Sequence, residues 1–318
     1  MEKIYMAATN TSNILSIDTV SSHGMQTSMA SIEAESSTLN IGDAVSIDLG
    51  YVGDHNVVFN GYVRGISRDT PNNKYSITAT DVLSRAMDYF IVSSTPDNPF
   101  TRSNISAEDL VEDVLNLAGI TNYTADPTSF TFAINNPLEV SLTSAYDYCN
   151  FISSLLAWHL YADINGLVHF VDRKPYLTGG ESTAASIYTT NAVSISYLKD
   201  AENLRNRVVV WGAEGITADV SESSPYLPSG FYKTAMVSAP TVIDSQSMAD
   251  LSASYNLDLY NRLTERLQVS IVGDSSIFPR NAAYVDVDDS DMDGNWYLYG
   301  VSHSANNGGF TTDIELRK

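Results

Sequence analysis

Five aspartates lie within eight residues near the C-terminal end of the chain. They are Asp286, Asp288, Asp289, Asp291 and Asp293, and Gly294 follows them. The order Asp289-x-Asp291-x-Asp293-Gly294 matches the first half of an EF-hand loop, in which oxygens at alternate positions bind Ca²⁺. This stretch is therefore the first candidate for chemistry, as a cation site.

The elements around this run decide between two interpretations. An EF-hand needs flanking helices and a bidentate Glu at position 12, but that position is Gly300 and both flanks alternate as strands do. Residues 284–287 and 296–303 are predicted strands, and the aspartates fall in the hairpin connection between them, where Asp and Gly are common. An acidic turn is favoured. The alternative is a weak Ca²⁺ site at Asp289, Asp291 and Asp293, and no other cofactor is expected.

No other motif points to catalysis. The sequence lacks a phosphate-binding P-loop, a G-x-G-x-x-G after a strand, a G-x-S-x-G elbow and an H-E-x-x-H helix. His159 and His169 share a predicted hairpin with a type I′ turn at Asn165-Gly166. Counting from that turn places His159 opposite Asp172 and His169 opposite Ala162, so a joint metal site is not expected. We predict a protein that is not an enzyme.

The amino-acid composition further narrows the class of protein. The chain has 318 residues, of which 43% are hydrophobic and 17% charged, as expected of a globular protein with two or three compact units. The net charge is −21 and Lys and Arg form no cluster, which argues against sequence-specific DNA binding. Cys149 is the single cysteine, so a disulfide scaffold is excluded. Neither a membrane-spanning segment nor a secretory signal is expected.

Alternating apolar residues predict strands over residues 1–92. Val45, Ile47 and Leu49 share one face of a strand, as Tyr75, Ile77 and Ala79 do in another. Short strands broken by Gly, Pro and Asn are typical of a small antiparallel barrel or sandwich. Residues 93–99, rich in Ser and Pro, are a linker by composition.

Residues 100–175 predict a small α+β unit. Ser106-x-x-Asp109 and Ser144-x-x-Asp147 resemble capping boxes at the starts of two helices, and Gly119 is a natural stop for the first. The hairpin around Asn165-Gly166 follows the second helix.

The remainder predicts a return to strands. Residues 190–211 plus 268–318 are assigned to a second β-unit, after a polar connection over 176–190. Residues 212–267 are assigned to an irregular insertion and one long helix, which begins near residue 245. Tyr226, Phe231 and Tyr232 in the irregular part are candidates for subunit contacts or for ordinary local packing.

Two segments, one in each β-rich end of the chain, have similar sequence patterns. Gly65-Ile66-Ser67, the Asn72-Asn73 turn and Tyr75 correspond in order to Gly300-Val301-Ser302, Asn306-Asn307 and Phe310. Each set reads as strand, turn, strand. The offsets differ by one residue, so two interpretations stay open: a chance similarity, or an internal duplication with two related β-units on either side of the helical middle.

The order of these parts resembles the baseplate hub proteins of contractile-tailed phages, namely the late-control protein D group and the hub of T4-like tails. Four stretches carry the resemblance across nearly the whole chain: residues 58–63 with 77–81, residues 105–110 with 118–120, residues 151–158 with 161–168, and residues 296–303 with 309–316.

The resemblance implies a β-rich α+β fold with two tube-like antiparallel β-barrel units that bracket a small helical α+β unit. It implies a homotrimer whose pseudo-sixfold ring joins a hexameric tail tube to a trimeric spike and contacts other baseplate subunits. The expected location is the tail baseplate of the virion, after assembly in the host cytoplasm.

The resemblance also gives the acidic charge two possible meanings. Carboxylates could line an ejection channel and keep DNA from adhering, or they could simply maintain solubility. Two other functions remain open: a receptor- or carbohydrate-binding tail-tip protein, and a peptidoglycan-cleaving tail enzyme.

Overall fold

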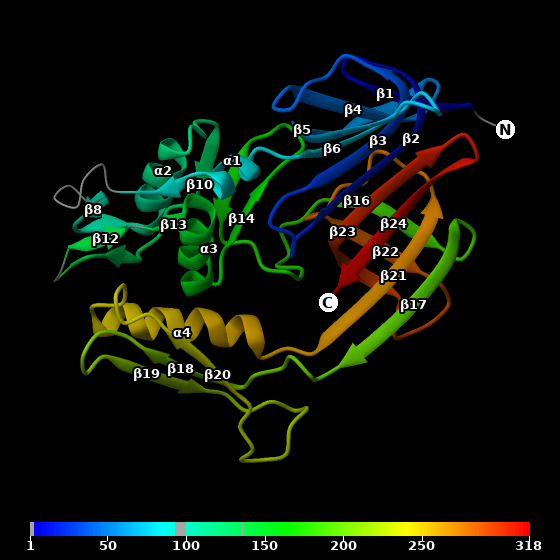
Figure 1. Cartoon of the computed structure of the whole chain (residues 1–318). Helices are drawn as coiled ribbons and strands as arrows, with labels where there is room; N and C mark the ends of the chain where they lie inside the picture. Colours follow the sequence, from blue (N-terminus) through cyan, green and yellow to red (C-terminus); the bar gives the residue numbers. More distant parts are fainter. Residues whose placement is uncertain (1–2, 93–99, 135–136, 141) are drawn as a thin grey trace.

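The computed structural model describes residues 3–92, 100–134, 137–140 and 142–318 (Figure 1). The predicted linker at residues 93–99 lies outside the described residues. The described chain is rich in β-strands, as the sequence predicts, and has four helices, of which the first lies in the segment predicted to contain only strands. Within the described part, no helix is long and apolar enough to cross a membrane.

The first six strands form an N-terminal unit around their own core. They are β1 (Ile4–Ala8), β2 (Thr11–Ser22), β3 (Met29–Ser37), β4 (Ala44–Tyr51), β5 (Asp54–Asp69) and β6 (Lys74–Thr80). Their spatial order is β1-β4-β5-β6-β3-β2, and the pair Ala8 and Thr11 joins β1 back to β2. The predicted alternation is confirmed, because Ile47 and Ile77 are fully buried in this core.

Six later strands form a C-terminal unit around a second core. They are β16 (Thr183–Tyr188), β17 (Ala192–Asp200), β21 (Thr264–Val272), β22 (Ala282–Asp286), β23 (Gly294–Asn306) and β24 (Gly309–Arg317). Pairing gives the order β16-β22-β23-β24-β21-β17. Trp296, Leu267 and Leu316 are fully buried in its core. β16 corrects the sequence analysis, which predicts a polar connection there.

The two units have the same strand order. Numbered within each unit, both run first, fourth, fifth, sixth, third, second. The sequence echo falls at equivalent places, on β5–β6 and β23–β24, and each pair carries a register shift immediately before the echoed glycine, Gly65 or Gly300. One difference is that β1 and β4 are antiparallel whereas β16 and β22 are parallel. The shared order and the matched irregularity support the duplication.

β2 joins the two units into one sheet. Residues 16–22 of β2 pair antiparallel with residues 300–306 of β23, while the other edge of β2 pairs with β3. A single twelve-stranded sheet therefore runs through both units, which Figure 1 shows as the blue and the orange-to-red strands side by side.

The middle of the chain contains α1 (Leu83–Asp88), α2 (Ala107–Leu117) and α3 (Ala145–Leu156). Short strands connect them: β7 (Phe90–Ile91), β8 (Phe100–Arg102), β9 (Ile105–Ser106), β10 (Tyr123–Ala125), β11 (Thr131–Phe132), β12 (Leu138–Val140), β13 (Thr143–Ser144), β14 (His159–Ala162) and β15 (Val168–Val171). Both predicted caps are confirmed, because Ser106 and Ser144 accept hydrogen bonds from the backbone N–H of Asp109 and Asp147. Gly119 has φ of +73°, as a helix stop requires.

The β14–β15 hairpin differs from the predicted register by one residue. His159 lies opposite Val171, and His169 lies opposite Tyr161. The cause is the Asp163 carboxylate, which accepts hydrogen bonds from the backbone N–H of Asn165 and Leu167. It fixes a loop longer than the two-residue turn that the Asn-Gly pair predicts.

Residues 207–260 also correct the sequence analysis. β18 (Arg207–Trp211) does not join the C-terminal unit but forms a separate sheet with β19 (Thr217–Ser221) and β20 (Thr234–Ser238), inside the segment predicted to be irregular. The long helix, α4 (Gln246–Tyr260), ends before the predicted residue 267, because the residues from Thr264 onward pair as β21. α4 packs on α3, where Ser252 donates a hydrogen bond to the Leu155 carbonyl.

Candidate functional site

One face of the twelve-stranded sheet carries small polar side chains and is the first candidate site. Since side chains alternate between faces, the registers place one set of residues together, opposite the two cores. We call this face the serine-rich face, and its polar residues and glycine are Ser16, Asp18, Ser22, Ser31, Glu33, Ser67, Asp69, Lys74, Ser76, Ser194, Ser196, Arg266, Gln268, Ser270, Gly300, Ser302, Ser304, Asp313, Glu315 and Arg317. The same registers also place the apolar side chains of Val20, Met29, Leu198 and Val272 on it. A hollow of about 450 Å³ lies on it, against β2, β23, β24, β21 and β17.

Carboxylates outnumber cations on the serine-rich face. Its acids are Asp18, Glu33, Asp69, Asp313 and Glu315, and its cations are Lys74, Arg266 and Arg317. Two of the cations are held by acids, since Lys74 lies 2.6 Å from Glu33 and Arg317 lies 2.9 Å from Glu315. The face is therefore mainly polar and carries more carboxylates than cations.

The seam between the two units crosses this face. Ser304 Oγ donates a 2.6 Å hydrogen bond to Asp18, and Ser302 Oγ donates a 3.1 Å bond to the Thr19 carbonyl. Both contacts add to the backbone ladder between β2 and β23.

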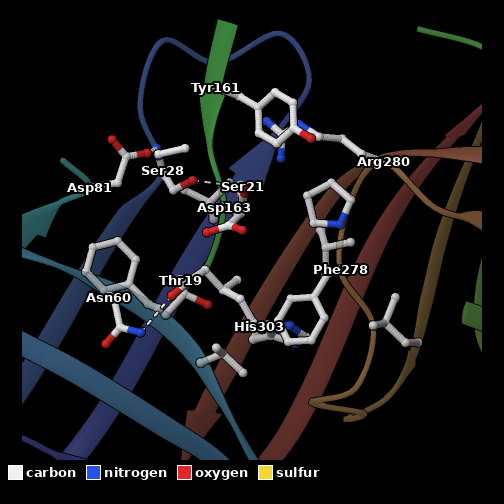
Figure 2. Close-up of a pocket in the computed structure, with 18 of the residues that line it drawn as sticks. Thr19, Ser21, Ser28, Asn60, Asp81, Tyr161, Asp163, Phe278, Arg280 and His303 are labelled. Carbon is white, nitrogen blue, oxygen red and sulfur yellow. Dashed lines mark hydrogen bonds between the residues drawn. The ribbon is translucent and has the colours of Figure 1, made fainter. Parts of the chain in front are cut away.

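A cavity of about 270 Å³ lies between the N-terminal unit, the β14–β15 hairpin and the segment that leads into β22 (Figure 2). Figure 2 shows Asp163 of the hairpin near Ser21 of β2, and the Tyr161 ring beside Arg280. Asn60 of β5 donates a 2.6 Å hydrogen bond to the Ile164 carbonyl and so attaches the hairpin to the sheet.

Arg280 is the central cation of this junction. Its side chain is buried, and its Nε donates a 3.2 Å hydrogen bond to His159 Nε2. Its Nη2 donates to the Ser22 carbonyl, and its guanidinium lies 3.9 Å from the centre of the Tyr161 ring. One side chain thus contacts β2, β14 and the approach to β22. Because removing a buried polar partner leaves others unpaired, Arg280 holds three parts of the chain together.

Two neutral histidines stack beside Arg280. The rings of His23 and His159 lie 3.8 Å apart and nearly parallel, and His23 Nδ1 is 2.9 Å from the Tyr297 hydroxyl. Burial, and then the nearby charge of Arg280, hold the pKa of His23 well below its ordinary value. Burial likewise holds the pKa of His159 well below its ordinary value, followed by the effects of His23 and Arg280.

Asp81 is a buried acid on the wall of the cavity. Its carboxylate accepts hydrogen bonds from the backbone N–H of Ser28, at 2.5 Å, and of Leu83, at 3.0 Å. Burial raises the pKa of Asp81 to about 6. Because backbone groups occupy the carboxylate, this residue positions the start of α1 against β3.

No family model matches the sequence, and no curated protein matches it. Solved structures do match. A tail protein from Neisseria meningitidis aligns over 99% of this chain and 96% of its own, with a TM-score of 0.70 and 10% identity. The 43 kDa tail protein of prophage MuSo2 from Shewanella oneidensis aligns over 99% and 97%, with a TM-score of 0.70 and 14% identity. The chain has the fold of phage tail proteins.

A type VI secretion component of E. coli shares this tail-protein fold, with a TM-score of 0.62 and 9% identity over 98% of this chain and 76% of its own. Its description reports structural similarity to T4 tail proteins gp27 and gp5. The resemblance predicted from the sequence is therefore confirmed.

The aspartate run forms a hydrogen-bonded turn in the tail-protein fold. Asp293 accepts a 2.7 Å hydrogen bond from the Val287 N–H, and Asp289 accepts a 3.0 Å bond from the Asp291 N–H. Among the residues that the structure describes, no group of three or more His, Cys, Asp and Glu side chains is arranged to hold a metal ion. These bonds show that the run folds as a hydrogen-bonded turn.

We expect calcium to leave this turn unchanged. Titration of Ca²⁺ into the protein should release no heat beyond dilution, because two of the three candidate carboxylates already accept backbone N–H groups. Isothermal calorimetry measures this directly. Saturable heat that disappears in the Asp291→Asn variant would instead establish the weak cation site.

Stability should depend on pH through the buried histidine of β23. Burial lowers the pKa of His303 to about 4, against about 6.5 when unfolded. Its contribution is present above pH 6.5 and is lost as the pH falls to about 4. Replacing His303 by Gln should remove roughly 3 kcal/mol of this pH dependence. Urea unfolding of both proteins between pH 4 and 8 measures the difference, which is independent of any constant loss of packing.

Asp81 serves as a control, because its effect on stability has the opposite dependence on pH. Its folded pKa of about 6 lies above the ordinary 3.8, so its contribution is present at low pH and is lost as the pH rises from about 4 to about 6. The Asp81→Asn variant should therefore steepen the loss of stability on acidification, where the His303 variant makes it shallower. Parallel curves for all three proteins would contradict the assignment.

The sequence did not reveal the junction residues. His23, His159 and Arg280 lie more than a hundred residues apart in sequence, and no motif links them. The predicted contact candidates Tyr226, Phe231 and Tyr232 lie in the connection between β19 and β20, and each is about half exposed.

Proposed function

We propose that the chain is the structural baseplate hub of a phage tail. In this proposal, three copies form a ring that joins a hexameric tail tube to a trimeric spike and lines the ejection channel. The observation that carries it is the repeated strand order of the N-terminal and C-terminal units. Three chains with two equivalent units each carry six similar surfaces, which can match a hexameric tube. The same three chains are related by threefold symmetry, which can match a trimeric spike.

We assign the channel wall to the serine-rich face. Most side chains of this face are polar, and its excess of carboxylates repels the phosphates of DNA. The seam bonds of Ser304 and Ser302 keep this face continuous between the two units. The role we propose is therefore structural and conducting, in the tail of the virion, with tube, spike and other baseplate proteins as partners.

The fold of known tail proteins supports this role. The test is the mass of the purified protein in solution, measured by light scattering, together with binding to the tube and spike subunits of the same phage. We expect a trimer that binds both. A protein that remains monomeric at all concentrations and binds neither would overturn the proposal.

A reconstruction of the whole particle would show where this chain lies relative to the tail axis. We expect threefold density for this chain on the tail axis, with the serine-rich face toward the channel. Density at the periphery of the baseplate would favour a receptor-binding role instead.

A further inference from the structure

β17 presents a long free strand edge. Within the described residues it pairs with β21 alone, over Ala192 to Asp200. Val193 and Leu198 are 69% and 44% exposed on this strand. Proteins usually shorten, charge or cover such edges because unpaired backbone groups recruit other strands. This edge is nine residues long and carries two exposed apolar side chains, and its one lysine, Lys199, is paired with Glu265 of the neighbouring strand. It therefore points to a partner strand.

The equivalent strand of the N-terminal unit already has a partner. β2 occupies the place of β17 in the strand order, and each has an extra residue at a register shift against its neighbour, Leu15 in β2 and Val193 in β17. Ser-Ile follows directly in both, as Ser16-Ile17 and Ser194-Ile195. The edge of β2 that corresponds to the free edge of β17 pairs with β23.

The equivalent of β23 also has a free segment. β5 occupies the place of β23, and their register shifts align Gly65 with Gly300. β4 covers β5 only as far as Tyr62, and no strand among the described residues pairs with residues 65–69 on that side. Ser67, Arg68 and Asp69 are exposed, whereas most of residues 300–305 are buried or half-buried against β2.

We propose that β17 of one copy pairs antiparallel with residues 65–69 of β5 in a second copy, in the register that β2 and β23 use within one chain. Asp200 then lies opposite Gly65, Leu198 opposite Ser67 and Ser196 opposite Asp69. The occupant of the edge is a second copy of this chain. The inference rests on the proposed function and specifies its subunit contact.

Side chains at the proposed seam are complementary. Within the chain, Asp18 of β2 lies opposite Ser304 of β23 and accepts its hydrogen bond. The corresponding pair between copies is Ser196 of β17 and Asp69 of β5, the same two residue types with their places exchanged. The contact uses two different edges, so it is heterologous and closes only as a ring. Repeating it makes the serine-rich face continuous around that ring.

Disulfide trapping tests the register. The double variant Leu198→Cys with Ser67→Cys places thiols directly opposite each other, and the native Cys149 is buried and does not compete. We expect mild oxidation to give covalent species up to the trimer, reversed by reductant. The matched control, Leu198→Cys with Arg68→Cys, points the second thiol to the other face and should give at least tenfold less cross-linking.

The outcomes separate the two proposals. A trimer by light scattering without the Leu198–Ser67 cross-link, or with equal cross-linking in the control, overturns the strand pairing and leaves the hub role intact. A protein that stays monomeric and binds neither the tube nor the spike subunit overturns both. Cross-linked chains that grow beyond the trimer support the pairing and overturn the threefold ring.

A charge exchange gives an independent readout. Ser196→Asp places two carboxylates opposite each other and should weaken association about fivefold per contact. Adding Asp69→Ser to that variant recreates the Asp–Ser pair of the internal seam and should restore association. Equal association in both variants would contradict the pairing.

Discussion

Replacing Trp296 by alanine is expected to lower the free energy of unfolding by about 3–5 kcal/mol. The indole is fully buried in the core of the C-terminal unit. Its Nε1 donates a 2.6 Å hydrogen bond to the Met292 carbonyl, and its ring meets Tyr197 edge to face at 6.3 Å. Alanine would leave a cavity and an unpaired carbonyl at the end of the aspartate turn.

Guanidinium unfolding followed by circular dichroism measures this loss. The matched control is Trp211→Ala, because Trp211 is half exposed on β18; it should cost less than about 1 kcal/mol. Similar midpoints for the two variants would contradict the central place of Trp296 in the core.

The Gly61→Ala variant should lose about 2–4 kcal/mol of stability through overpacking. A Cβ at this position of β5 would lie 2.2 Å from the Thr80 carbonyl oxygen and 2.6 Å from Phe59 Cζ. The carbonyl belongs to the backbone of β6, so it can move only if the paired strands move with it.

The same unfolding measurement tests this variant. Gly180→Ala is the control, because a Cβ there meets no atom within 4 Å. That substitution should be neutral or slightly stabilising, since alanine restricts the unfolded chain. An unchanged midpoint for Gly61→Ala would mean that β5 and β6 separate more easily than their pairing indicates.

Local signals predicted much of the fold. The caps at Ser106 and Ser144 were predictable because a side chain and an N–H three residues apart meet in any helix start. The echo of Gly65 in Gly300 was visible because both strand pairs keep the same glycine beside the same register shift. These features depend on neighbours in sequence.

Features set by distant segments were not predictable in the same way. Alternation alone could not show whether Val208 and Val210 of β18 face the C-terminal unit or the core around α3 and α4, where they lie. The end of α4 was missed because Leu263 continues the four-residue spacing of the helix, while pairing with β17 and β24 makes the following residues a strand. Tertiary pairing overrides helical periodicity there.

The residues of the candidate site also divide into those that a local sequence pattern signals and those that only long-range contacts bring together. The aspartates attracted attention because they are close in sequence, yet backbone N–H groups occupy two of the three candidate carboxylates. The junction around Arg280 had no such signal, since its partners Ser22 and His159 come from other parts of the chain.

The seam between β2 and β23 has a consequence for synthesis of the chain. β1 to β6 are contiguous in sequence, so the N-terminal unit can form while the ribosome is still making the rest. The edge of β2 then waits for β23, which is nearly three hundred residues later. Because pairing over such a separation is slow, this edge stays open to mispairing with other nascent chains until β23 is made, and delayed release of the last strands should reduce the yield of folded protein.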